Sequence, residues 1–486
     1  MKTINKFLIY ILILFNSHLF LGCDLDLEPY DSKSSDLAFK SEDDIQIATY
    51  GNYAAIVAEA YTRHFMTLNE WPGDNVIQSG ADGDQASLAA SYKHIPNMYP
   101  TRDFWAQSYK LIYGANQILG KIEEGQSPSL DQLKGENYFL RAFAHFNLVR
   151  LFGRPYPQNG GGSLGVPIVT ENSDMELPVR NTVKEVYDFV ISDLLKAAEL
   201  MTETKNSNFA SKEVAKALLS RVYLYMEDNE NSIKYANEVI NSGRYTLAGT
   251  DVYIKSPTLV PESNPETIFC FRHTLADNKD KNAVGSLYYN DPETLSTGWG
   301  EYYAPQQLFD LLNKFPTDAR LHFITPHYVD GELQYRGTSP RYFINKFNWQ
   351  EGVANLSSPI YLRLAEMYLN RAEANAKMGE DQLALDDINL IRKRADIPDT
   401  GLYTLDNLRW NETVLDVVLE ERRLELAYEG HRPHDLYRNS RPLVLASPGL
   451  HGEDNFHFTV EPSDDRVIFY IPEREINVNS NLVQNP

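Results

Sequence analysis

The sequence predicts a mainly α-helical protein, in which a scaffold of helix pairs carries long loop-rich insertions that form a ligand face. Three observations lead to this expectation. Apolar residues recur at helical spacing in several segments, two pairs of such segments have similar length, and long polar and aromatic stretches separate them. The chain of 486 residues is longer than a usual single core, so several subdomains or one elongated architecture are expected.

The predicted helices of the N-terminal half have recognisable ends. Ser41 offers an N-cap hydroxyl ahead of acidic first-turn residues. Residues 104–119 and 136–152 are helix-periodic, and Gly153 ends the second of these segments. A helix pair that starts at a serine N-cap then spans residues 211–243.

A second helix pair is predicted over residues 360–394. An apolar stripe that includes Tyr361 and Tyr368 runs along its first helix, and Gly379 separates the two helices. Small alanines at the crossing and a period of about 34 residues match the tetratricopeptide unit, although other sequence separates the two pairs. A last long helix is predicted over residues 411–429.

Three long segments between the helices are predicted to be loops: residues 71–100, 155–178 and 245–361. Loops of this length in a compact protein usually carry function. The chain is also rich in tyrosine, with 30 Tyr beside 22 Phe and 5 Trp. Because tyrosine joins an apolar ring to a hydroxyl, it suits wet binding surfaces. The loops are therefore where a ligand is expected.

The composition excludes several function classes. The chain has 45 Lys and Arg against 67 Asp and Glu, a net charge of −22. An acidic chain without a basic tract is repelled by phosphate backbones, so no nucleic acid is expected as a partner. Two cysteines are too few for a disulfide framework or a multi-cysteine metal site.

No catalytic set, metal site or cofactor is predicted, and the chain is not expected to be an enzyme. Residues 161–165 satisfy G-x-S-x-G, but their flanks predict a loop rather than the strand and helix of a nucleophile elbow. His431, His434 and Asp435 follow a helix end, where capping of the last carbonyls explains them better than metal binding.

Opposite charges also alternate near the end of the last helix. Glu420 and Arg423 are spaced i,i+3, as are Arg422 and Glu425. This spacing predicts a structural ion-pair network rather than catalytic carboxylates.

Residues 1–22 are predicted to be a lipoprotein signal peptide. Lys2 and Lys6 precede an apolar run over residues 7–15, which suits a signal peptide but is too short to span a bilayer. Cys23 directly follows the small residue Gly22 and is the expected lipidation site, so the mature protein is expected to be anchored to a membrane. The alternative is an ordinary secretory signal with an incidental cysteine.

Several segments resemble one known family. Residues 362–374 (LRLAEMYLNRAEA) and 420–430 (EERRLELAYEG) are similar to the SusD/RagB family of Bacteroidetes outer-membrane lipoproteins. The start at residues 23–29 and the segments 138–145 and 470–476 are similar too, in the order of the family. The resemblance divides the chain into an N-terminal SusD-like region, 23–225, and a C-terminal SusD/RagB region, 265–486.

The resemblance implies a tetratricopeptide-like scaffold with a ligand surface built by loops. It further implies a lipoprotein on the surface of the cell outer membrane, anchored through Cys23. In the family, such a protein captures oligosaccharides, delivers them to a TonB-dependent SusC-like transporter and does no chemistry. The acidic residues Asp24, Asp26 and Glu28 resemble a signal that sends lipoproteins to the cell surface.

Three alternatives remain open from the sequence. The ligand is a peptide if the chain follows the RagB branch, and backbone-pairing strands then matter more than stacked aromatic rings. A pure scaffold would hold the transporter and bind nothing. An anchored glycosidase would need two carboxylates positioned about 5–10 Å apart, and no pair is indicated.

Glycan binding requires flat aromatic rings against the C–H faces of sugars, with amides and carboxylates for the hydroxyls. Aromatic residues of the long loops are the expected platforms, and two polar residues close to the first of them are the expected hydrogen-bonding partners. The predicted ligand-binding residues are Trp71, Asp74, Asn75, Trp299, Tyr302 and Tyr303. For each of them, a role as a core residue that anchors its loop is the alternative.

Overall fold

The computed structural model describes residues 39–78, 85, 87–171, 177–446 and 457–486. The predicted signal peptide, residues 1–22, and the predicted lipidation site Cys23 lie outside the described residues. Residues 48–486 cluster into one compact unit, and residues 1–47 into another. Among the described residues, no helix is both long enough and apolar enough to cross a membrane.

The described chain is mainly α-helical, as the sequence predicts. The helices are α2 (Glu42–Ile56), α3 (Glu59–Glu70), α4 (Ser87–Ala90), α5 (Tyr99–Leu119), α6 (Pro128–Phe152), α7 (Val183–Leu200), α8 (Lys212–Tyr225), α9 (Asn229–Ile240), α10 (Thr250–Tyr253), α11 (Val284–Tyr288), α12 (Gln306–Leu312), α13 (Leu364–Lys377), α14 (Asp381–Arg394), α15 (Val414–Glu425), α16 (Arg432–Arg438) and α17 (Glu473–Val478). The strands are β1 (Ile77–Gln78), β2 (Thr267–Cys270), β3 (Tyr302–Tyr303), β4 (Ile324–Pro326), β5 (Tyr328–Val329), β6 (Glu332–Leu333), β7 (Tyr335–Arg336), β8 (Ser339–Pro340), β9 (Tyr342–Ile344), β10 (Ile360–Arg363), β11 (Leu443–Ala446) and β12 (His457–Val460).

Helix starts follow the capping residues. The Ser211 hydroxyl accepts a hydrogen bond from Val214 N at 3.4 Å and begins α8, as predicted. Helix α6 begins at Pro128, well before the predicted start, because Ser127 caps it. The apolar pattern does not reveal the first turns of α6, because several of their buried side chains are polar. Gln132, for example, donates to Glu136 at 3.0 Å.

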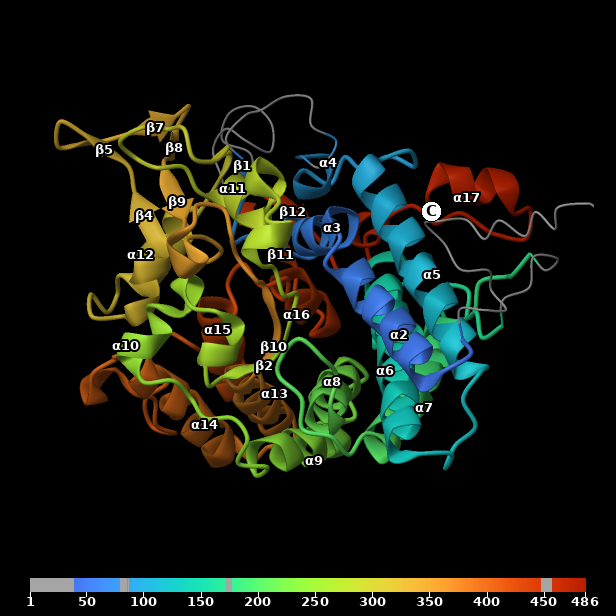
Figure 1. Cartoon of the computed structure of the whole chain (residues 1–486). Helices are drawn as coiled ribbons and strands as arrows, with labels where there is room; N and C mark the ends of the chain where they lie inside the picture. The colour runs from blue at the N-terminus through green and yellow to red at the C-terminus, as the bar shows by residue number, and fades with distance from the viewer. Residues whose placement is uncertain (1–38, 79–84, 86, 172–176, 447–456) are drawn as a thin grey trace, which may run out of the picture. The chain divides into compact units, whose positions relative to one another are not determined.

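The separated helix pairs lie side by side in the folded chain. Helix α9 packs against α13, so that α6, α7, α8, α9, α13 and α14 follow one another as neighbours (Figure 1). Arg371 on α13 joins the two pairs by donating to Asn237 on α9 at 2.6 Å and to Asp387 on α14 at 2.6 Å. The tetratricopeptide-like stack is therefore continuous in space although it is interrupted in sequence.

The start of the second predicted pair requires a correction. Residues 360–363 form strand β10, which pairs antiparallel with β2, and α13 begins only at Leu364. The buried Tyr361 fits a helical apolar stripe by spacing alone, but its hydroxyl bonds Asn147 on α6 at 3.1 Å. A short apolar run of this kind is ambiguous between helix and strand until its partner strand is known.

The long predicted loop over residues 245–361 contributes three strands to a small sheet, and the predicted loop over residues 71–100 contributes the fourth, β1. Strands β1, β3, β9 and β4 pair antiparallel in that order, and hairpins β5–β6 and β7–β8 lie between β4 and β9. Figure 1 shows these strands at the upper left, away from α8, α9 and α14 at the bottom of the view. The sheet therefore positions the inserted loops on a different side of the unit from the outer helix pairs.

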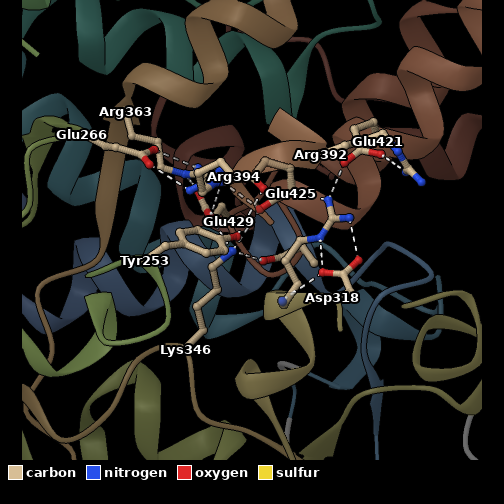
Figure 2. A network of polar contacts seen from close by, with 12 residues as sticks. Tyr253, Glu266, Asp318, Lys346, Arg363, Arg392, Arg394, Glu421, Glu425 and Glu429 are labelled. Carbon is tan, nitrogen blue, oxygen red and sulfur yellow. Dashed lines mark hydrogen bonds and ion pairs between the residues drawn. The ribbon is translucent and has the colours of Figure 1, made fainter. Parts of the chain in front are cut away.

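Helix α15 lies at the centre of a buried ion-pair network (Figure 2). Glu425 accepts hydrogen bonds from Arg363 at 2.5 Å and from Arg394, and all three side chains are buried. Burial opposes the ionisation of Glu425, but the surrounding guanidinium groups outweigh it and hold its pKa well below the usual range. Glu421 accepts from Arg320 at 2.6 Å and pairs in the same way.

The prediction of a structural network is thus confirmed, but its partners differ from those predicted. Arg422 pairs with Asp435 on α16, between Nε and Oδ2 at 3.0 Å, and Glu425 pairs with arginines of β10 and α14. Arg423 donates to Asn75 at 2.9 Å. The helix is buried, so each charge meets a different neighbouring element rather than its i,i+3 neighbour.

Candidate functional site

Two of the predicted platforms, Trp71 and Tyr302, lie in the core. The Trp71 ring is fully buried and stacks on Tyr302 with 3.6 Å between centroids and an interplanar angle of 17°. Its Nε1 donates to the Tyr288 hydroxyl at 3.0 Å. A ring covered in this way presents no face to a sugar, so both residues anchor their loops in this structure, which corrects the prediction of exposed platforms.

Tyr303 is buried as well. It lies in strand β3 opposite Phe343 of β9, and the two rings meet edge to face with 5.6 Å between centroids. Its neighbours come from strands that are distant in the sequence, so no local sequence pattern predicts that Tyr303 is buried. Tyr303 is therefore a core residue of the small sheet rather than an exposed platform.

Asp74 is held in ion pairs rather than presented to solvent. Its carboxylate accepts from Arg432 Nε at 2.7 Å and Nη2 at 3.1 Å, and Arg423 Nη2 lies 3.3 Å away. Burial raises the pKa of Asp74, but the two guanidinium groups outweigh burial and lower the pKa to about 2. Asp74 thus ties the segment after α3 to α15 and α16.

Hydrogen bonds of Asn75 and Glu70 join the end of α3 to the segment after α15. Asn75 donates to Glu70 at 3.2 Å, and Glu70 accepts from the backbone N–H of Tyr428 at 3.0 Å and of Gly430 at 2.7 Å. Gly430 has a φ of +79°, which favours glycine at this turn. Burial raises the pKa of Glu70 to about 7, because these hydrogen bonds only partly compensate the lost hydration.

Trp299 is the predicted platform that the structure leaves open. Half of its side chain, 50%, is exposed, and its Nε1 donates to Lys281 O at 2.9 Å. The preceding Gly298 packs so closely that a Cβ there would lie 2.1 Å from Tyr289 O. This close approach fixes the loop and turns the indole toward solvent.

Sequence reasoning missed two exposed aromatic residues on the hairpins. Tyr328 in β5 is 56% exposed and Tyr335 in β7 is 55% exposed. The signal was present in the sequence: Asp330 and Gly331 form a two-residue turn in which both φ angles are positive, which is typical of a tight hairpin. A short two-stranded hairpin of this kind leaves its side chains largely in solvent, and both residues of β5 are exposed.

These tyrosines lie near a third in the strand register. Tyr342 of β9 lies opposite Pro326, two residues before Tyr328. Tyr335 lies opposite Pro340, two residues before Tyr342. Burial raises the pKa of Tyr342, and the nearby phenols of Tyr328 and Tyr335 raise it further. The Tyr342 hydroxyl donates to Gln306 at 3.1 Å. We call Tyr328, Tyr335 and Tyr342 the tyrosine cluster.

Polar groups of α12 adjoin the tyrosine cluster. Phe309 stacks on Tyr342 with 4.6 Å between centroids, and one turn of the same helix carries an amide and a carboxylate. Gln306 donates from Nε2 to Asp310 at 2.7 Å, so this pair is ordered beside the rings. Exposed rings with an ordered amide and carboxylate at their edge are the groups that bind a sugar through its C–H face and its hydroxyls.

Comparison with known families matches most of the chain. Residues 25–224 match a family described as starch-binding and associating with the outer membrane, and residues 324–486 match the SusD family. The chain belongs to the SusD/RagB family. The resemblance found in the sequence is thereby confirmed.

Individual relatives agree along the full length. SusD-like protein P38 of Formosa agariphila is 27% identical over 100% of this chain and 99% of its own. Among solved structures, a SusD superfamily protein from Bacteroides thetaiotaomicron has a TM-score of 0.82 at 29% identity and covers 92% of this chain and 100% of that chain. One from Bacteroides vulgatus has a TM-score of 0.81 at 28% identity, with 92% and 99% coverage. The mainly helical fold is that of the SusD superfamily.

Proposed function

We propose that this SusD/RagB family protein binds oligosaccharide at the cell surface and delivers it to a TonB-dependent SusC-like transporter of the outer membrane. The observation that carries the glycan part is the tyrosine cluster, in which the exposed rings of Tyr328 and Tyr335 accompany the buried Tyr342. The hydroxyl of Tyr342 donates to the amide of Gln306, which in turn donates to the carboxylate of Asp310. The description of the matched family as starch-binding supports the same ligand class. The proposed role is binding and transfer, without a chemical step.

Trp299 supplies a further exposed ring on the inserted loops. An indole is a larger stacking surface than a phenol, and the fixed loop around Gly298 holds it in place at little entropic cost on binding. We therefore place the ligand surface on the loops around the small sheet, with Trp299, Tyr328 and Tyr335 as its stacking residues.

Surface anchoring is the second part of the proposal. Lipidation of Cys23 would leave the body of the protein outside the membrane, tethered through residues that lie beyond the described ones. The family description, associating with the outer membrane, supports this location. Mass spectrometry of the protein from outer membranes would show the mass of a lipid on Cys23, and an unmodified cysteine would contradict it.

The binding role is tested with the soluble form that begins after Cys23. Isothermal titration against a glycan panel and a peptide pool is expected to show saturable binding to one glycan class. Binding to peptides alone would favour the RagB-like alternative. Binding to neither the glycans nor the peptides would favour the non-binding scaffold.

The transporter partnership has its own test. Affinity purification of the tagged lipoprotein from detergent-extracted outer membranes is expected to recover a TonB-dependent transporter in a fixed ratio. Recovery of the lipoprotein alone, under mild detergent and from cells grown on the glycan that it binds, would contradict the delivery role. A scaffold that binds no ligand would still be recovered with the transporter, but it would show no binding in the titration.

A further inference from the structure

A groove lies between α12, α15 and α16. Its volume is about 490 Å³, enough for more than one sugar ring. No residue of the tyrosine cluster lines it. Its lining includes Trp410, Glu412, Asp416, Glu420, Arg423, Arg432 and Arg441.

An exposed indole is fixed at this groove. Trp410 is 43% exposed, and its Nε1 donates to both carboxylate oxygens of Glu420 at 2.8 Å. Lys314 Nζ lies 3.5 Å from the ring centroid and holds the indole by a cation–π contact. The ring is therefore oriented before any ligand arrives, which lowers the entropic cost of binding.

The backbone at the residue before Trp410 is strained and is fixed by hydrogen bonds. Arg409 has a φ of +59°, a conformation that costs a residue with a Cβ roughly 1 kcal/mol. Its amide donates to Asn407 at 3.1 Å, and its guanidinium Nε donates to Gly401 O at 3.2 Å. Strain of this kind persists where surrounding contacts over-determine a loop, and here it fixes where the indole points.

Hydrogen-bonding groups at the back of the groove are also ordered. Arg423 and Arg432 turn Nε and Nη2 toward Asp74 and Asn75. Within the described part of the chain, no protein group accepts from Nη1 of either arginine. The sequence-predicted pair Asp74 and Asn75 therefore orients two donors at the groove instead of contacting a ligand itself.

The charges of the lining are balanced. It contains the carboxylates Glu412, Asp416 and Glu420, and as many guanidinium groups. Arg441 and Asp416 pair at 2.7 Å across the lining. A lining without net formal charge does not select an anion or a cation, whereas paired polar groups around an aromatic ring suit a neutral ligand rich in hydroxyls.

We propose that this groove is a second sugar-binding site, in which the Trp410 ring stacks against the C–H face of a neutral sugar and the surrounding carboxylates and guanidinium groups bind its hydroxyls. This site deepens the proposed function by adding a second subsite for the same ligand class. A chain that engages two sites at once gains affinity without a new contact at either one.

The test uses 5-fluorotryptophan in the soluble chain and one-dimensional fluorine NMR. Each tryptophan gives one resonance, so the wild-type chain gives five and a chain without Trp299 gives four. Trp410→Phe assigns the groove signal. The probes are maltohexaose, cellohexaose, xylohexaose and mannohexaose at millimolar concentration, with inorganic phosphate as the charged comparison. The background is the triple variant Trp299→Ala, Tyr328→Ala and Tyr335→Ala, which removes the first surface.

A saturable shift of the Trp410 resonance with at least one hexasaccharide, and none with phosphate, is the expected result. Glu412→Gln in that background keeps Trp410 and its resonance. This substitution is expected to weaken hexasaccharide binding several-fold. Unchanged positions of the other resonances and an unchanged melting temperature show that the fold persists.

A Trp410 resonance that no hexasaccharide moves would overturn the second site, and so would a shift with phosphate alone. The proposed function is judged separately, in the wild-type chain, by the Trp299 resonance and by titration. If Trp410 shifts only when a transporter is added, the groove is a protein interface and the sugar assignment is wrong.

Discussion

The ion-pair network around α15 and the tyrosine cluster on the hairpins use polar and aromatic groups in opposite ways. In the network, the buried carboxylates of Glu421 and Glu425 accept from guanidinium groups of other elements, so loss of one partner leaves a buried charge. In the tyrosine cluster, the rings of Tyr328 and Tyr335 are about half exposed to solvent, and only Tyr342 is buried, so removing the two exposed rings leaves no buried charge. The network is therefore needed for the chain to fold, whereas we propose that the tyrosine cluster determines what the chain binds.

The largest effect is expected from breaking the network. Glu425→Ala leaves Arg363 and Arg394 without their shared partner, and we expect a loss of about 3–5 kcal/mol in the free energy of unfolding. Urea denaturation followed by circular dichroism measures it. Glu332→Ala, on the exposed hairpin, is the matched control and should change stability by less than about 0.5 kcal/mol.

Trp71→Ala tests the same contrast with an aromatic residue. The ring is fully buried against Tyr302, so we expect a loss of about 3–5 kcal/mol from the transfer and cavity costs. Thermal and urea unfolding measure this loss. Wild-type stability combined with abolished glycan affinity would show instead that Trp71 contacts the ligand.

The pH dependence of stability sharpens the account of the interior. Glu70 has a pKa of about 7 in the folded chain, against an ordinary value of 4.5. Between these two pH values the folded state therefore binds more protons than the unfolded state. Stability contributed by Glu70 is therefore present below about pH 4.5 and is lost as pH rises to about 7. We expect this to amount to about 3 kcal/mol.

The neutral variant Glu70→Gln removes that titration. The difference in unfolding free energy between wild type and variant should change with pH across this window and be flat above it. Taking the difference cancels the buried histidines and paired carboxylates that titrate in both proteins. A difference that stays constant from pH 4.5 to 7 would show that Glu70 is ionised throughout.

The smallest stability effect, with the clearest effect on binding, is expected at the hairpins. Tyr328→Ala with Tyr335→Ala should leave the unfolding free energy within about 0.5 kcal/mol, because both side chains are exposed. Loss of about 1 kcal/mol of stacking per ring should weaken glycan binding roughly tenfold or more.

Isothermal titration measures this change in affinity. Tyr113→Ala, an exposed tyrosine on α5, is the control and should bind as the wild type does. Phenylalanine at positions 328 and 335 should restore most of the affinity, since it keeps the ring. Equal weakening by the control would mean that the loss is not specific to the tyrosine cluster.

Local signals in the sequence predict the helices, because a cap and an apolar stripe are read within one segment. Ser211 and Gly153 are such signals, and both helix ends lie where they indicate. The continuity of the scaffold could not be predicted, since contacts such as that between Arg371 and Asn237 join segments far apart in the chain.

The candidate site was predicted less well for the same reason. Trp71 and Tyr302 are covered by each other across more than two hundred residues, and no local pattern shows that burial. The exposure of Tyr328 could have been predicted from the turn at Asp330, because a short two-stranded hairpin leaves its side chains largely in solvent. Trp299 is the predicted residue that remains in the proposed surface.

A crystal structure of the soluble chain with the glycan that it binds is the most direct test of the proposed ligand surface. We expect a sugar ring against Tyr328, Tyr335 or Trp299, with hydroxyls near Gln306 or Asp310, and an unchanged, buried Trp71. A glycan bound only elsewhere, with these exposed rings untouched, would contradict it.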